Sequence, residues 1–127
     1  MSQVFLTLGS LLAAIAVAAG AFASHALKEQ LSDRSLEIFE TATKYQMYHA
    51  LAIILVALWL SSLPAQNPWM VTTGWAFVAG ILLFSGSLYA LSVTGIKILG
   101  AITPFGGVAF LIGWGCLAVS VWMKTAG

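Results

Sequence analysis

The fold is decided by the stretch Glu40-Thr41-Ala42-Thr43-Lys44-Tyr45-Gln46-Met47-Tyr48-His49-Ala50-Leu51, where a charged connection turns into an apolar helix. Residues 25–44 hold seven of the nine charged side chains, and after them only Lys97 and Lys124 are charged. Charged side chains are costly inside a bilayer and gather in the connections between spans. The sudden loss of charge therefore predicts that the chain passes from water into lipid at this stretch.

The composition agrees with a membrane protein. The 127 residues are 61% hydrophobic and 7% charged, whereas a soluble domain has about a quarter of its residues charged. A bilayer core of about 30 Å needs about 20 apolar residues per helix. Four such runs with short connections account for the sequence and leave no room for a soluble domain. A net charge of +1 without a basic block argues against a nucleic-acid partner.

We predict a single all-α integral membrane domain over residues 1–127, folded as an antiparallel up-down bundle of four transmembrane helices. The predicted spans are residues 4–24, 45–63 (in a helix that starts near residue 33), 69–92 and 104–123. Ser32, Asn67-Pro68 and Thr103-Pro104 are helix-start signals for the last three helices. Residues 1–3 carry no Lys or Arg, so we expect the first span to be a retained helix rather than a signal peptide.

Small residues recur along the predicted helices. In lipid, small side chains let helix backbones approach closely, and packing replaces the hydrophobic effect as the source of association. We expect helix contacts at Gly9, Ala13, Gly20, Gly86, Gly106, Gly107 and Gly113.

Lys and Arg set the expected orientation, since cytoplasmic connections carry an excess of them. The first and third connections lie on one side and hold Lys28, Arg34, Lys44 and Lys97, whereas the other side holds only Lys124. We therefore expect a multi-pass protein of the plasma (inner) membrane. Its first and third connections would be cytoplasmic, and both termini would lie outside.

Motifs along the whole chain carry a resemblance to a known family. They are Gly20-Ala21-Phe22-Ala23-Ser24-His25-Ala26-Leu27, the stretch from Glu40 to Leu51, Phe84-Ser85-Gly86-Ser87-Leu88-Tyr89, and Leu99-Gly100-Ala101-Ile102-Thr103-Pro104-Phe105-Gly106-Gly107. In these motifs the chain resembles the YwdK/YgdD-type small bacterial membrane proteins, domain of unknown function 423, which are similar to the eukaryotic transmembrane protein 256 group. Relatives usually have Gly where this chain has Ser24. The resemblance implies a four-span inner-membrane protein and no particular reaction.

The candidate ligand-binding residues lie toward one membrane face and are His25, Glu40, Tyr45, Gln46, His49 and Tyr89. An ionisable residue within a span, such as His49, is a functional hypothesis by default. The alternative is a neutral imidazole that is hydrogen-bonded to a neighbouring helix and holds the bundle in register. For His25 we favour a structural or interfacial role.

Two histidines do not make a zinc site, which needs three or four ligands, and Glu40 could join them only if the second helix bends. We therefore expect no metal and no cofactor. Every Asp and Glu lies between residues 29 and 40, outside the spans or at their edge, which argues against a proton-driven antiporter. No nucleophile set or phosphate-binding loop is present, so we expect no enzymatic activity.

Two classes of function remain for a protein surrounded by membrane lipids. In the first, which we favour, the chain is a structural or assembly partner that packs into a homo-oligomer or a larger membrane complex. In the second, the His/Tyr/Gln cluster binds a small molecule, a lipid headgroup or a quinone.

Overall fold

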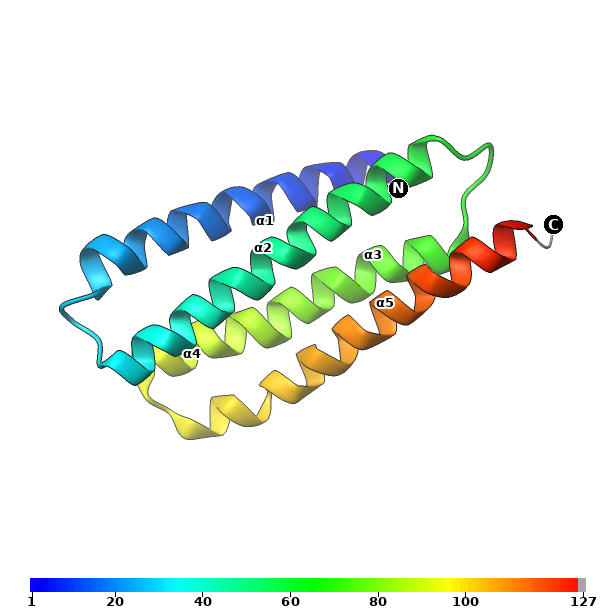
Figure 1. The fold of residues 1–127 in the computed structure, drawn as a ribbon. Helices are drawn as coiled ribbons and strands as arrows, with labels where there is room; N and C mark the ends of the chain where they lie inside the picture. Colours follow the sequence, from blue (N-terminus) through cyan, green and yellow to red (C-terminus); the bar gives the residue numbers. More distant parts are fainter. Residues whose placement is uncertain (126–127) are drawn as a thin grey trace.

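The chain forms helices joined by short connections, as a computed structural model that describes residues 1–125, with side chains to Met123, shows (Figure 1). No strand occurs within residues 1–125, and the expected all-helical class is confirmed. The elements are α1 (Ser2–Phe22), the π-helical η1 (Ala23–Leu27), α2 (Asp33–Ser61), α3 (Pro68–Gly80), the π-helical η2 (Ile81–Ser85), α4 (Gly86–Thr94), the 3-10 helix η3 (Lys97–Ala101) and α5 (Thr103–Thr125).

These elements make four antiparallel rods (Figure 1). The rods are α1 with η1, α2 alone, α3 with η2 and α4, and α5 with the preceding η3. The chain reverses direction after each rod, so the α1–α2 and α4–α5 connections lie at one end of the bundle. The α2–α3 connection lies at the other end, near both termini (Figure 1).

Local hydrogen bonds fix the helix starts. Ser32 Oγ accepts a bond from the Ser35 N–H at 3.1 Å, which satisfies a free donor in the first turn of α2. Asn67 Oδ1 does the same for the Trp69 N–H at 2.9 Å, and Pro68 opens α3 with its fixed φ. Gly95 ends α4 at φ 71°, a left-handed conformation that glycine adopts without steric cost.

The π turn η2 keeps one face of the third rod directed at the core. Inward residues recur every four positions, at Phe77, Ile81, Ser85 and Tyr89. On a regular helix of 3.6 residues per turn, this spacing drifts by about 40° per step. The wider π turn offsets that drift, so that Phe77, Ile81 and Ser85 are all buried and Tyr89 is half-buried.

Large rings and glycines form the closest contacts between rods. A Cβ added at Gly74 would collide with the Phe5 ring, at Gly80 with the Phe110 ring, and at Gly113 with the Phe77 ring. These rings belong to the main apolar core, which is built from α1, α2, α3, η2 and α5. Each glycine therefore provides the space into which a ring from another helix packs.

The predicted small-residue contacts divide into two groups. Gly9 lies against Ile54 and the Ala50 carbonyl, Gly106 against the Phe84 backbone, and Gly113 against Phe77. Ala13 is half-buried. At Gly20, Gly86 and Gly107 an added Cβ would meet no atom of another helix within 4 Å, so these three glycines make no close contact inside this bundle. Gly74 and Gly80 were not predicted as contacts.

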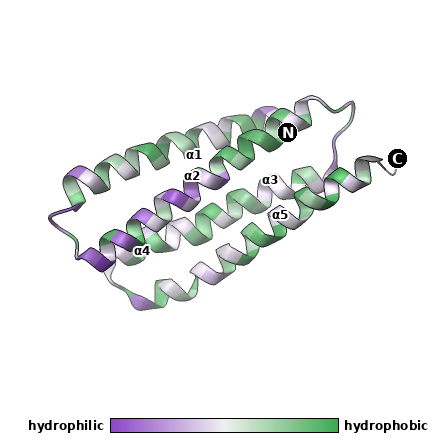
Figure 2. Ribbon diagram, in the orientation of Figure 1, coloured by the Kyte–Doolittle hydropathy of each residue, from purple (hydrophilic) through white to green (hydrophobic). Residues whose placement is uncertain are grey.

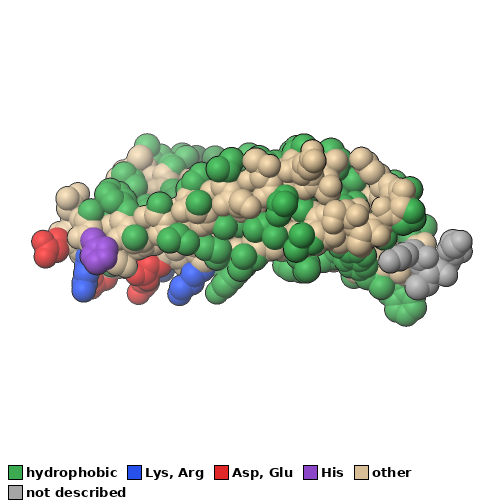
Figure 3. All heavy atoms as spheres, turned by 90° about the horizontal axis from the view of Figure 1, so that it is seen from above, with side chains coloured by type: hydrophobic (Ala, Val, Ile, Leu, Met, Phe, Trp, Pro, Cys, Tyr) green, Lys and Arg blue, Asp and Glu red, His purple; other side chains and the backbone are tan. Residues whose placement is uncertain are grey.

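Three helical rods are long and apolar enough to cross a membrane: Ser2–Leu27, Pro68–Thr94 and Lys97–Met123. The α2 helix is not among them, although it has 29 residues. Its first half carries the charged side chains and then Tyr45, Gln46, Tyr48 and His49, which make that half hydrophilic (Figure 2). The charged side chains that the structure describes gather at one end of the molecule, and hydrophobic side chains are spread over the rest of the visible face, between backbone and uncharged polar groups (Figure 3).

Candidate functional site

His49 lies in the middle of α2 with only 4% of its surface exposed, and rings from two other helices, α3 and α5, surround it. The imidazole stacks on Phe110 of α5 with a centroid distance of 3.5 Å and an interplanar angle of 10°. Phe77 of α3 meets the imidazole edge-on at 5.3 Å, and Trp114 of α5 lies 5.8 Å away. The side chain thus joins α2 to both α3 and α5.

The two ring nitrogens of His49 both have hydrogen-bond partners. The Trp114 indole N–H, which can only donate, lies 3.1 Å from Nε2. The Tyr45 carbonyl oxygen, which can only accept, lies 2.8 Å from Nδ1. These partners assign the proton to Nδ1 and the lone pair to Nε2, so the imidazole is neutral and has no free polar atom.

Gln46, one turn before His49, makes a second connection between helices. Its Nε2 donates to the Leu12 carbonyl of α1 at 2.8 Å, and its Oε1 accepts a bond from the Tyr89 hydroxyl of α4 at 2.7 Å. In a regular helix a carbonyl oxygen uses one lone pair for the backbone hydrogen bond. The Gln46 amide binds the second lone pair of the Leu12 carbonyl. One buried amide, 2% exposed, therefore links α1, α2 and α4.

Other hydroxyl groups complete this internal polar network. Ser85 Oγ donates to the Ala42 carbonyl at 2.8 Å, so the end of η2 is fixed to α2. Thr73 Oγ1 contacts the Gly113 carbonyl at 3.1 Å and joins α3 to α5. Every buried side-chain nitrogen and oxygen among the described residues has a hydrogen-bond partner. The interior of the bundle is consequently polar in places and fully satisfied.

The structure brings together four of the six predicted site residues: Tyr45 with His49, and Gln46 with Tyr89. The Tyr45 ring is 40% exposed and contacts the Phe84 ring at 4.7 Å. The side chains of His25 in η1 and Glu40 in α2 are exposed and make no described hydrogen bond; Glu40 only accepts, through its carbonyl oxygen, from the Thr43 hydroxyl at 2.7 Å. Among the described residues, no three His, Cys, Asp or Glu side chains lie close enough to hold a metal ion.

Three members of this cluster were not predicted from the sequence: Trp114, Phe110 and the Leu12 carbonyl. Trp114 is 65 residues from His49, and Phe110 lies within the same apolar run of α5. No local pattern marks them as partners of an imidazole. The four-residue spacing of Phe110 and Trp114, which places both on one face of α5, is the only signal that could have indicated them.

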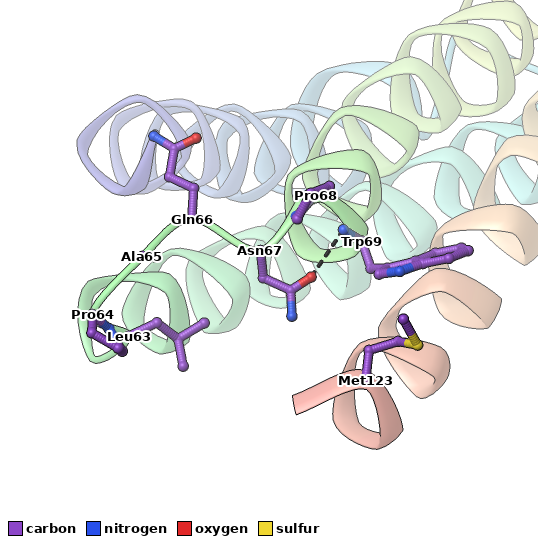
Figure 4. Close-up of a pocket in the computed structure, with 8 residues that line it drawn as sticks. All are labelled: Leu63, Pro64, Ala65, Gln66, Asn67, Pro68, Trp69 and Met123. Atoms are coloured by element: carbon purple, nitrogen blue, oxygen red, sulfur yellow. Dashed lines mark hydrogen bonds between the residues drawn. The ribbon is translucent and has the colours of Figure 1, made fainter. Parts of the chain in front are cut away.

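An open groove of about 590 Å³ lies at the end of the bundle that carries the α2–α3 connection (Figure 4). It is lined by the α2–α3 connection together with Trp69 and Met123. The Asn67 side chain in this groove is engaged in capping α3, as the hydrogen bond to the Trp69 N–H shows (Figure 4). None of the lining side chains is ionisable, so the groove offers no acid–base chemistry.

Comparisons with known proteins give the same family over most of the chain. Residues 19–107 match the family described as "Protein of unknown function (DUF423)". No solved structure shows a significant match. A UPF0382 membrane protein of Staphylococcus epidermidis is 46% identical over 125 residues, covering 98% of this chain and 99% of the relative. The UPF0382 membrane protein YwdK of Bacillus subtilis is 48% identical over 118 residues, covering 93% and 95%. This chain therefore belongs to the DUF423 family and is, like these relatives, a membrane protein.

Proposed function

We propose that α2 is a fourth membrane span and that its Gln46 and His49 side chains are turned away from lipid. Gln46 and His49 are buried and bonded to other helices. Leu51, Leu55 and Leu58 on the outer face of the same helix are each more than half exposed. A hydropathy average cannot separate these two faces, because it counts inward and outward side chains alike. Beyond Lys44, lipid would meet this leucine face together with the exposed rings of Tyr45 and Tyr48.

The distribution of Lys and Arg between the two ends of the bundle suggests how the protein is oriented in the membrane. We propose that the end bearing Lys28, Arg34, Lys44 and Lys97 lies in the cytoplasm of a bacterial cell, at the plasma membrane. The opposite end, with the α2–α3 connection and both termini, would then lie outside.

We propose further that the protein is a structural or assembly partner within the membrane. The observation that carries this proposal is that every side-chain nitrogen and oxygen of His49 and Gln46 has a hydrogen-bond partner within the chain. A site for a quinone or a headgroup needs polar groups that converge on a ligand. Here the polar groups converge on each other, and they hold four helices in register while an apolar surface faces outward.

Native mass spectrometry of the protein released from a mild detergent tests this proposal. The wild type is compared with His49→Ala and with Tyr48→Ala, a matched change of an exposed ring on the same helix turn. We expect a defined number of subunits and no bound small molecule in all three proteins. A discrete additional mass in the wild type and in Tyr48→Ala, but not in His49→Ala, would overturn the proposal in favour of ligand binding.

A further inference from the structure

The α4–α5 connection exposes apolar side chains at the end of the bundle where the charges gather. Ile98 is 73% exposed and Phe105, at the start of α5, is 69% exposed. Val93, Ile96 and Ile102 are also exposed. Lys97 is the one charge in the connection, and the whole sequence contains no acidic residue after Glu40. A connection that projected into water would leave these large side chains without cover.

The α1–α2 connection at the same end has the opposite character. Its exposed side chains include Lys28, Glu29 and Gln30, and η1 places the exposed imidazole of His25 beside them. Figure 2 shows the hydrophilic colouring concentrated in this connection and in the first turns of α2. The two connections lie at one end of the bundle (Figure 1), yet their surfaces suit different surroundings.

We propose that the α4–α5 connection is a membrane-docking segment that lies in the headgroup region of the lipid leaflet, whereas the α1–α2 connection reaches water. Its exposed apolar surface continues, without an intervening charge, into the outer face of α5 at Val108 and Leu111. That face belongs to the apolar rod Lys97–Met123, which is long enough to cross a membrane. The lipid that covers α5 therefore extends over the connection.

Lys97 indicates the chemistry of the lipid that the segment meets. Its side chain is exposed between Ile96 and Ile98 and forms no ion pair among the described residues. With the neighbouring isoleucines in the acyl boundary, the flexible ammonium reaches the phosphate level, as lysines at membrane interfaces do. The partner is thus an anionic phospholipid headgroup. This inference concerns the outer surface of one connection and is independent of the internal cluster.

The test places a polarity-sensitive NBD fluorophore on a single cysteine in the full chain, with Cys116→Ala as background. The two sites are Ile98→Cys and, as a matched control in the other connection, Gln30→Cys. The proteins are reconstituted in phosphatidylcholine vesicles with and without phosphatidylglycerol, and with lipids that carry a quencher near the headgroup. Folding of each variant is checked by gel filtration and circular dichroism before labelling.

We expect blue-shifted emission and loss of most of the fluorescence to the lipid quencher at position 98, and water-like, unquenched emission at position 30. Phosphatidylglycerol should increase the quenching at position 98, and Lys97→Gln should remove that increase. Water-like emission at position 98 would overturn the proposal. Blue-shifted emission without lipid quenching would also overturn it, because a second copy of the chain would then cover the segment.

Discussion

The contact between α5 and the third rod is tested most sharply by two adjacent glycines. A Cβ added at Gly106 would overlap the Phe84 backbone nitrogen and lie 2.7 Å from Phe84 Cα, whereas a Cβ at Gly107 would meet nothing within 4 Å. The obstacle at Gly106 is backbone, so no side-chain rotation relieves it. Gly106→Ala therefore forces α5 away from η2, and Gly107→Ala leaves the packing unchanged.

The magnitude follows from the cost of overpacking. Forcing one methyl group into a filled helix contact costs about 1–3 kcal/mol. Both substitutions also gain the helix preference of alanine over glycine, about 1 kcal/mol, and this gain cancels in the comparison. We expect Gly106→Ala to be less stable than Gly107→Ala by about 1–3 kcal/mol, or roughly 5- to 150-fold in the unfolding equilibrium.

The assay is reversible unfolding in mixed micelles of a mild detergent and increasing dodecyl sulfate, followed by circular dichroism. Wild type, Gly106→Ala and Gly107→Ala are measured side by side. Gly107→Ala should be as stable as the wild type or more so. Equal stability of the two variants would refute the contact between Gly106 and Phe84, and with it the described position of α5.

Two further predictions concern the internal polar cluster. Trp114→Phe keeps a ring but removes the donor to His49 Nε2, and it should lower the unfolding free energy by about 0.5–2 kcal/mol. The control is Trp75→Phe, because the Trp75 indole N–H makes no described hydrogen bond. An equal loss of unfolding free energy in the two variants would assign the effect to ring size. A double-mutant cycle of Gln46→Leu and Tyr89→Phe should give a coupling energy of about 0.6 kcal/mol or more, typical of membrane interiors. A coupling of zero in that unfolding assay would contradict the bond between Tyr89 and Gln46.

Much of the fold could be predicted because its signals are local. The starts of α2 and α3 depend on side chains that bond within their own first turn, as Ser32 and Asn67 do. The apolar runs of the other rods are equally visible in a single sequence. The predicted helix beginning near residue 33 matches α2, which begins at Asp33.

The features that could not be predicted depend on which helix faces which. Gly74 and Gly80 matter only because Phe5 and Phe110 reach them from other rods. No sequence motif marks the π turn η2. The turn directs Ser85 toward α2, where its hydroxyl donates to the Ala42 carbonyl, and that contact is not visible in the sequence. Gly107 and Gly106 look identical along the chain and differ only in where their hydrogens point.

The site shows the same limit. The polar residues of α2 stand out in the sequence, and the choice between a ligand site and a structural clamp stayed open there. Their partners are a backbone carbonyl in α1, an indole in α5 and a phenol in α4. Only the packing of all four rods places these groups within hydrogen-bond distance.

Whether α2 crosses the membrane can be measured by labelling single cysteines at its two ends. Single cysteines replace the exposed Glu29 before α2 and the exposed Ala65 after it, in a Cys116→Ala background. Right-side-out membrane vesicles are treated with a membrane-impermeant maleimide before and after permeabilisation. We predict that Ala65→Cys reacts in intact vesicles and that Glu29→Cys reacts only after permeabilisation. Reaction of both cysteines from the same side would contradict a membrane-spanning α2.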